Sequence, residues 1–320
     1  MSIEDNIALR RPDIKQSTLA TYMNSLKNLR KRIDEKTELN DTGFLQDYDK
    51  VMTALEDMKI TTKKNKITSV LVALDADTKK DEKLIDRYQK ALKDLNDEYV
   101  AFLKTQTKTD TQKENWLEYD DLVQVFNDIM ADVKHSKLSK KDTLDNKDFD
   151  LLQQLVILRT YLDHPVRNDF ADMRVITSKE EKKLPEDDEG NYLVLLPKNK
   201  KQFVLNDFKN RDKIGKKRLD VTAPLNKIIN LWLKHNKSGY YLVMKDRKRP
   251  LNPNGITKYL NKIFMKRTNK KIGSSLIRHI VISKVSENQP TILEEEKKAQ
   301  DIEDKFLHSG GMNKLYRKVD

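Results

Sequence analysis

The segments SLIRH (residues 275–279) and FLHS (residues 306–309), followed by Tyr316, are the stretch from which the fold of this 320-residue chain is inferred. An arginine, a histidine and a tyrosine in this order suit chemistry on a phosphodiester. A guanidinium holds two phosphate oxygens in a fork, an imidazole donates to them, and a phenol attacks phosphorus. Because an unassisted phenol has a pKa of about 10, a nucleophilic tyrosine needs positive charge around it. The structural alternative is a helix-capping Arg278, a surface His308 and a tyrosine that packs the tail.

The order and spacing of these residues resemble the C-terminal signature of the tyrosine recombinases, the phage integrase family. That family carries a His/Lys-x-x-Arg-His element, then Gly-His-Ser, then a nucleophilic tyrosine. Three positions depart from the pattern: Ser275 begins the first element, Leu307 replaces the glycine, and His308 precedes Tyr316 by eight residues, about one fewer than usual. The resemblance implies two further cationic residues upstream, the first of them an arginine and the second a lysine on a β-hairpin.

The composition predicts an intracellular, soluble protein with a polyanionic partner. The net charge is +12, and 36% of the residues are charged, which favours nucleic acid as the partner over an anionic membrane surface. The absence of cysteine excludes disulfides and thiolate metal sites. No apolar run approaches the roughly 18 residues of a membrane span, and residues 1–5 do not resemble a signal peptide. We therefore expect no membrane partner.

Residues 1–103 are predicted to form a helical bundle, because apolar residues recur at intervals of three and four through 19–33, 51–58, 67–71 and 85–103. Residues 104–113 contain no apolar side chain and are interpreted as a linker, which would let two basic bodies clamp a rod-shaped ligand. Residues 114–320 are predicted to form the second domain. The candidate DNA contacts of the bundle, whose alternative is a solvated helix face, are Lys27, Arg30, Lys31, Lys63 and Lys64.

The first upstream cation fits the chain after a buried helix. Helices are predicted over 116–133 and 151–162, and the second must end before Pro165. Arg167 follows, with Asp169 as a possible accessory acid, although the family usually places that acid three residues after the arginine. An ion pair that caps the helix is the structural alternative.

The second cation fits a predicted β-hairpin. Short apolar runs at 192–196, 203–205 and 219–221 predict strands. The resemblance places the family's catalytic lysine at Lys209, late in the second strand, with Lys213 as the alternative. In the structural interpretation, a lysine-rich hairpin tip touches phosphates without performing chemistry. Helices are predicted further on at 224–232, 252–264, 276–281 and 291–306. The remaining candidate DNA contacts are Lys213, Lys216, Lys266 and Arg267.

The predicted fold is mainly α with a small antiparallel β-sheet: an N-terminal helical bundle of the core-binding type and a mixed α/β catalytic domain. The resemblance implies that Tyr316 attacks DNA to give a 3′-phosphotyrosine. Arg167 and Arg278 would hold the phosphate, His308 would donate to it, and Lys209 would protonate the leaving oxygen. No metal, ATP or other cofactor is implied. The implied partners are a double-stranded recombination site and, in the synaptic complex, three further copies of the chain.

Three alternatives compete with this prediction. A type IB topoisomerase uses the same five kinds of residue, but the compact helical N-terminal region favours a recombinase. A transposase would need a metal held by clustered carboxylates. A non-catalytic DNA-binding protein that retains a decayed site is the third alternative, because Ser275 supplies at most one hydrogen bond where the family has a histidine or lysine. Loss of one such donor slows chemistry about a hundredfold or more.

Around Arg167, the form Pro-Val-Arg-Asn-Asp-Phe resembles integrases of large DNA viruses and their mobile elements.

Overall fold

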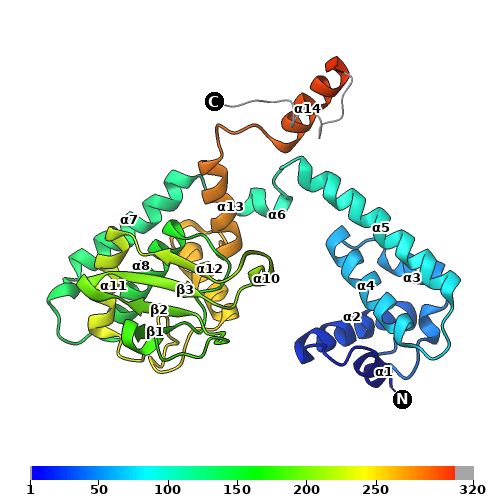
Figure 1. Cartoon of the computed structure of the whole chain (residues 1–320), viewed down its shortest axis with the longest axis horizontal. Helices are drawn as coiled ribbons and strands as arrows, with labels where there is room; N and C mark the ends of the chain where they lie inside the picture. Colours follow the sequence, from blue (N-terminus) through cyan, green and yellow to red (C-terminus); the bar gives the residue numbers. More distant parts are fainter. Residues whose placement is uncertain (1, 307–320) are drawn as a thin grey trace. The chain divides into compact units, whose positions relative to one another are not determined.

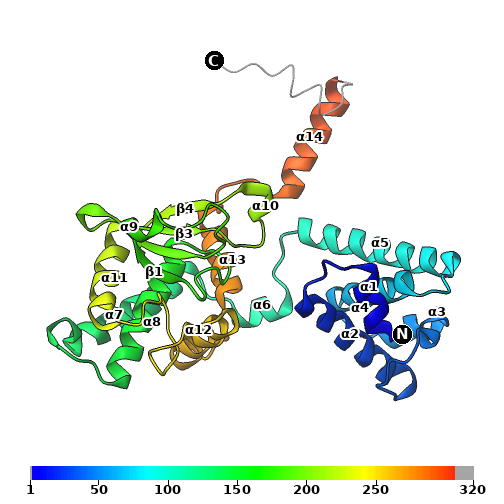
Figure 2. The same cartoon turned by 60° about the horizontal axis from the view of Figure 1, so that its bottom comes forward.

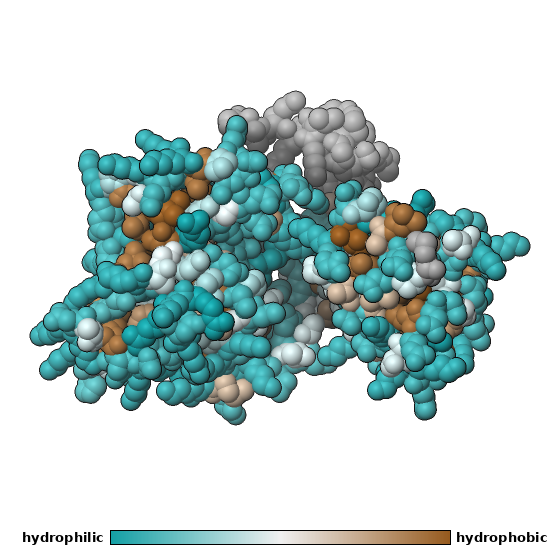
Figure 3. Space-filling view, turned by 90° about the horizontal axis from the view of Figure 1, so that it is seen from below, coloured by the Kyte–Doolittle hydropathy of each residue, from teal (hydrophilic) through white to brown (hydrophobic). Residues whose placement is uncertain are grey.

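The structure, a computed structural model, describes residues 2–306 and is mainly helical with a small sheet, which confirms the predicted fold class. The chain divides into two compact units (Figure 1). The first comprises the residues up to Thr107 and the segment that begins at Pro290, and the second comprises residues 108–289. Figure 3 shows a face on which hydrophilic side chains predominate in both units. Among residues 2–306, no helix has the length and apolar character needed to cross a bilayer.

The first unit is a bundle whose helices bury one apolar stripe each, with Leu26, Leu29 and Tyr88 fully buried. The predicted helices all occur, and α4 and α5 lie side by side (Figure 2). The sequence did not predict α1, in which only Ile3 and Ile7 are buried. The helices are α1 (Ile3–Arg10), α2 (Gln16–Asp34), α3 (Tyr48–Leu55), α4 (Ile60–Ala76) and α5 (Glu82–Lys104), with the 3-10 helix η1 at Gly43–Leu45.

Residues 104–113 are not wholly irregular. A short helix, α6 (Asp110–Asn115), begins within them, because Thr109 and Gln112 cap it reciprocally through side chain and backbone. This local hydrogen bonding needs no apolar residue, so hydropathy alone did not predict the helix.

The helix α14 (Ile292–Phe306) closely matches the predicted span of 291–306. Its first turn is tied to the end of α5 by two contacts. The Ile292 amide donates to Gln106 Oε1 over 2.9 Å, and Lys104 Nζ lies 2.7 Å from a carboxylate oxygen of Glu296. These contacts connect the start of α14 to the N-terminal part of the first unit.

In the second unit, five long helices and a four-stranded sheet share one hydrophobic core, which includes the fully buried Trp232, Tyr161 and Phe203. Asn252 caps α12 by accepting from the Gly255 amide. The long helices are α7 (Tyr119–His135), α8 (Asn146–Asp163), α11 (Ala223–His235), α12 (Pro253–Thr268) and α13 (Ser274–Val285). Short helical turns are η2 (Leu138–Lys140), α9 (Ser178–Glu181), η3 (Pro197–Asn199) and α10 (Arg211–Ile214).

The sheet has the order β1-β2-β3-β4 and is mixed rather than purely antiparallel. The strands are β1 (Arg174–Thr177), β2 (Tyr192–Leu195), β3 (Lys201–Leu205) and β4 (Lys217–Asp220). The pair β1–β2 is parallel, and the other two pairs are antiparallel. The sequence predicted the last three strands but not β1, because this four-residue strand has only one buried side chain, that of Ile176.

Lys201, which begins β3, is an unusual buried cation. It is 5% exposed, and its Nζ donates to the amide oxygens of Asn199 (3.1 Å), Asn226 (2.7 Å) and Asn230 (2.6 Å). No carboxylate pairs with it among the described residues, and burial lowers its pKa below the ordinary 10.5. Three neutral oxygens therefore satisfy the three protons of this ammonium group.

We expect Lys201→Met to lower the free energy of unfolding by about 1–3 kcal/mol, because it leaves three amide oxygens without their donor. Since the unfolded chain binds this proton more tightly, the stability of the unaltered protein should rise as the pH increases toward 10.5, and the variant should lack that rise. Urea denaturation at several pH values measures both effects. Lys200→Met, at an exposed neighbouring position, is the control and should change neither; equal losses in the two variants would contradict the prediction.

Candidate active site

The two candidate arginines lie on segments that are far apart in the sequence. The helix α8 ends at Asp163, shortly before Pro165, and Arg167 lies exposed in the turn that follows. Arg278 lies in the second turn of α13 and is half-buried, because its neighbour Ile277 anchors the helix in the core.

Asn168 joins the segments that carry these arginines. Its Nδ2 donates to the Pro253 carbonyl at the start of α12 over 2.8 Å, and its Oδ1 accepts from Ser274 Oγ at the start of α13 over 2.6 Å. Tyr161 in α8 donates its hydroxyl to the Arg167 carbonyl over 3.0 Å. The adjacent residues Arg167 and Asn168 are therefore hydrogen-bonded to three helices, through the Arg167 carbonyl to α8 and through the Asn168 side chain to α12 and α13.

The electrostatics place Arg167, Arg278 and Asp169 at one site. Partial burial, and then the positive charge of Arg167, lower the pKa of Arg278 below its ordinary value, while Asp169 acts in the opposite sense. Burial raises the pKa of Asp169, and both arginines oppose that rise. These mutual effects require the three groups to lie close together. Arg278 therefore lies within electrostatic reach of both Arg167 and Asp169, and the single negative charge of Asp169 offsets only part of the positive charge of the two arginines.

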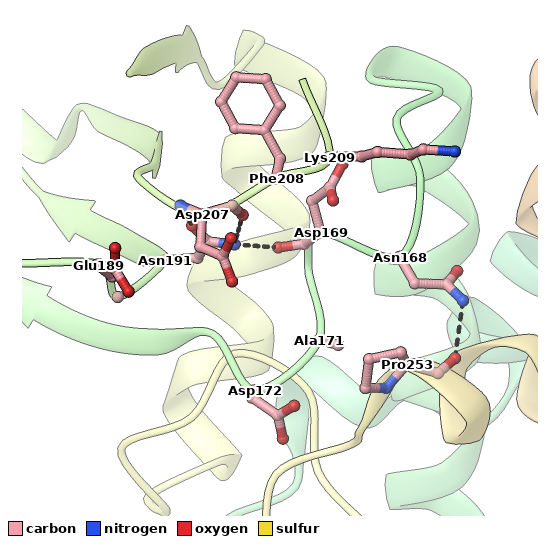
Figure 4. Close-up of a pocket in the computed structure, with 11 residues that line it drawn as sticks. Asn168, Asp169, Ala171, Asp172, Glu189, Asn191, Asp207, Phe208, Lys209 and Pro253 are labelled. Atoms are coloured by element: carbon pink, nitrogen blue, oxygen red, sulfur yellow. Dashed lines mark hydrogen bonds between the residues drawn. The ribbon is translucent and has the colours of Figure 1, made fainter. Parts of the chain in front are cut away.

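Beside this cluster lies a cavity of about 390 Å³. Figure 4 shows the loop of Asp169 and the loop of Lys209 meeting at its edge. Asn191 connects the two loops through hydrogen bonds, because its Nδ2 donates to the carbonyls of Asp169 (3.0 Å) and Asp207 (2.9 Å). Further carboxylates at Asp172, Glu189 and Asp207 also line the cavity, so a phosphate would be repelled from it and would approach from the side of the arginines.

Lys209 is exposed in the turn between β3 and α10. Its predicted location late in a strand is wrong, because β3 ends at Leu205 and the chain then turns at Asn206, whose amide donates to Asn191. Lys209 still lines the same cavity as Asp169. Its side chain is drawn extending away from the cavity (Figure 4).

The alternative cations and the accessory serine have different environments. Lys213 is exposed in α10. Lys216 donates to the carbonyls of Glu186 (2.8 Å) and Asp188 (3.3 Å), which ties it to the preceding loop. Ser275 is exposed in the first turn of α13, whereas the adjacent Ser274 is buried and bonds to Asn168.

Two of the five predicted catalytic residues, His308 and Tyr316, lie outside the described residues. Their segment follows α14, which ends at Phe306. The residues that sequence reasoning missed are Asn168, Asn191 and Ser274. No signal in a single sequence distinguishes them, because loop asparagines and helix-start serines are common and their partners are distant in the chain.

The candidate DNA contacts of the N-terminal bundle separate into two groups. Lys27 and Lys31 on α2 are exposed, and neither has an ion-pair partner among the described residues. Arg30 is half-buried, lies 5.1 Å from the ring centre of Phe44, and pairs with Asp34 over 3.7 Å. On α4, Lys63 and Lys64 are half-buried, and the Nζ of the second lies 4.3 Å from the ring centre of Tyr99.

We expect Lys27→Ala and Lys31→Ala each to weaken DNA binding and to reduce the slope of log K against log salt by about 0.9, the contribution of one phosphate contact. Arg30→Ala should instead lower the melting temperature, because that side chain packs in the bundle. Titration of duplex DNA at several salt concentrations and thermal unfolding give the two measurements. An unchanged slope in both lysine variants would remove α2 from the DNA interface.

Two further candidate contacts lie at the end of α12. Lys266 is exposed there, whereas Arg267 donates to Asp132 of α7 over 2.8 Å. Arg267 therefore holds α12 against α7, and Lys266 is the freer of the two for an external phosphate.

Comparisons with known proteins do not identify a relative: no family model matches the chain, and no curated protein is similar to it. Among residues 2–306, no group of three or more His, Asp or Glu side chains is arranged to hold a metal ion.

Proposed function

We propose that this protein is a site-specific DNA recombinase or integrase that cleaves and rejoins strands through a tyrosine. The observation that supports the proposal is the convergence of Arg167 and Arg278, which lie close enough for the positive charge of Arg167 to lower the pKa of Arg278, although they come from distant segments. Two like charges repel each other. A site that nevertheless gathers them, with Asp169 offsetting only part of the charge, is suited to an anion that carries two free oxygens.

In the proposed reaction, the Tyr316 hydroxyl releases its proton to solvent water and attacks a DNA phosphorus in line with the 5′-oxygen. A bond forms between the phenolic oxygen and phosphorus while the bond to the 5′-oxygen breaks, so the products are a 3′-phosphotyrosine and a free 5′-hydroxyl. Arg167 and Arg278 bind the non-bridging oxygens, where charge grows in the transition state. His308 donates a hydrogen bond to the same phosphate. Lys209, or Lys213 as the alternative, gives its proton to the leaving 5′-oxygen.

Attack on the phosphotyrosine by the 5′-hydroxyl of another strand reverses the same steps and exchanges the partners. One phosphodiester is broken and one is formed, so the bond energy is conserved and no ATP is consumed. The cationic side chains supply the charge stabilisation, and the proposed chemistry requires no metal. Exchange between two duplexes calls for four active sites, so we propose that four copies assemble on DNA.

The test uses a duplex with a nick close to the cleavage position, so that a short fragment carrying the 5′-hydroxyl diffuses away and the enzyme remains linked to DNA. We expect a covalent complex that forms in EDTA, with mass spectrometry placing the nucleotide on Tyr316. Dependence of cleavage on a divalent metal would contradict the proposal and favour a transposase. Relaxation of supercoiled plasmid without exchange between two sites would favour a topoisomerase.

A further inference from the structure

The Asn168 side chain uses both of its polar atoms to connect segments distant in sequence. Its Nδ2 donates to the Pro253 carbonyl over 2.8 Å and to Thr257 Oγ1 over 2.9 Å, both on α12. Its Oδ1 accepts from Ser274 Oγ over 2.6 Å and from the Tyr161 hydroxyl over 3.4 Å. The amide orientation follows from these partners, because the Pro253 carbonyl can only accept and must face the nitrogen.

Two of these partners, Tyr161 and Ser274, connect Asn168 to the segments that carry the arginines. Tyr161 also donates to the Arg167 carbonyl, so it fixes the backbone on one side of Asn168. Ser274 begins α13, whose next turn carries Arg278. A displacement of Asn168 therefore moves the backbone of one arginine and releases the helix start of the other.

We propose that Asn168 is a positioning residue that sets the separation of Arg167 and Arg278, and so determines how well the pair fits one phosphate. This inference rests on the function proposed above. Asn168 does not need to touch DNA in order to act, because its effect passes through the Arg167 backbone and the start of α13. A misplacement of about 1 Å in a site of this kind costs about a hundredfold in rate.

The experiment compares the unaltered protein with Asn168→Ala on nicked DNA. Two quantities are measured: the rate constant for covalent complex formation at saturating DNA, and the dissociation constant for DNA. We expect the rate to fall about a hundredfold while affinity changes less than about threefold, because the charges that bind the phosphates remain. Ser274→Ala, which removes one hydroxyl and leaves the contacts to α12, should lower the rate about tenfold. It provides a second test if Asn168→Ala does not fold.

Asn236→Ala is the matched control for lost stability. Asn236 is buried, whereas Asn168 is half-buried, and its amide likewise bonds on both sides: it donates to the Tyr240 carbonyl over 2.7 Å and accepts from Ser238 Oγ over 2.7 Å. Both of its partners lie in its own turn. Its melting temperature should fall as far as that of Asn168→Ala. Its cleavage rate, measured well below that temperature, should remain unchanged.

A substrate with a methylphosphonate at the cleaved position separates positioning from structural damage. Replacing a non-bridging oxygen by methyl removes the negative charge that the arginine pair stabilises, so a misplaced arginine matters less. The deficit of Asn168→Ala should shrink from about a hundredfold to within about tenfold on this substrate. An equal deficit on both substrates, or a rate like that of the unaltered protein, would overturn the inference alone. Failure of the unaltered protein to trap DNA would overturn the proposed function and this inference with it.

Discussion

Tyr316→Phe is expected to reduce covalent trapping on nicked DNA by about 10⁴-fold or more, because removal of a nucleophile leaves the other catalytic groups nothing to activate. The phenyl ring has nearly the same volume as the phenol, and the phosphate-binding cations are untouched. DNA affinity should therefore stay within about twofold. Gel analysis of the covalent complex and a binding titration on the same DNA measure the two quantities.

Tyr119→Phe is the matched control for this variant. Tyr119 lies at the start of α7, and its hydroxyl has no hydrogen-bond partner among the described residues. Trapping by the control should equal that of the unaltered protein. Trapping that persists in Tyr316→Phe would show that another side chain is the nucleophile, and mass spectrometry of the adduct would then identify it.

Arg278→Ala is expected to slow cleavage by about 10²–10³-fold, the cost of losing one donor to the charge that develops in the transition state. The effect on DNA affinity should be only a few-fold, because one phosphate contact among several is lost. Arg278→Lys keeps the positive charge but loses the planar fork that binds two oxygens. Its cleavage rate should fall by about tenfold or more and lie between the rates of the unaltered protein and of Arg278→Ala. Single-turnover cleavage at saturating DNA measures the chemistry apart from binding.

Arg249→Ala serves as the control for Arg278→Ala, because Arg249 is an exposed arginine of the same unit that pairs with Asp246 over 2.6 Å. Its cleavage rate should be unchanged. If Arg278→Ala weakened affinity and cleavage by the same factor, Arg278 would be a phosphate anchor without a role in the transition state. That result would favour a DNA-binding protein that does not cut.

The helices could be predicted because their signal is local. The stripe of apolar residues through 85–103 appears as α5 at Glu82–Lys104, and α8 ends at Asp163, two residues before Pro165. In each case the residues that decide the element lie within a few turns of one another. The strand β1 has no such signal, since its parallel pairing with β2 depends on a segment 18 residues away in register, from Arg174 to Tyr192.

The candidate site also combines features that are local in the sequence with contacts between distant segments. The identities and order of Arg167, Lys209 and Arg278 could be taken from the sequence, because a resemblance depends on residue types and spacing. Whether the side chains of Arg167 and Arg278 lie close together depends on the path of the chain between them. Lys209 illustrates the limit: the resemblance placed it late in a strand, but the strand ends earlier, where the amides of Asn206 and Asp207 donate to Asn191 Oδ1.

The sequence by itself therefore determined the mainly helical class, most of the helices and the types of side chain available for chemistry. Only the tertiary structure decided that Asn168 bridges α12 and α13 and that Arg167 and Arg278 share one electrostatic environment. The physical reason is the range of the interactions. Apolar periodicity acts over a few residues, whereas the bond from Ser274 to Asn168 spans 106 residues and exists only when both segments are already folded.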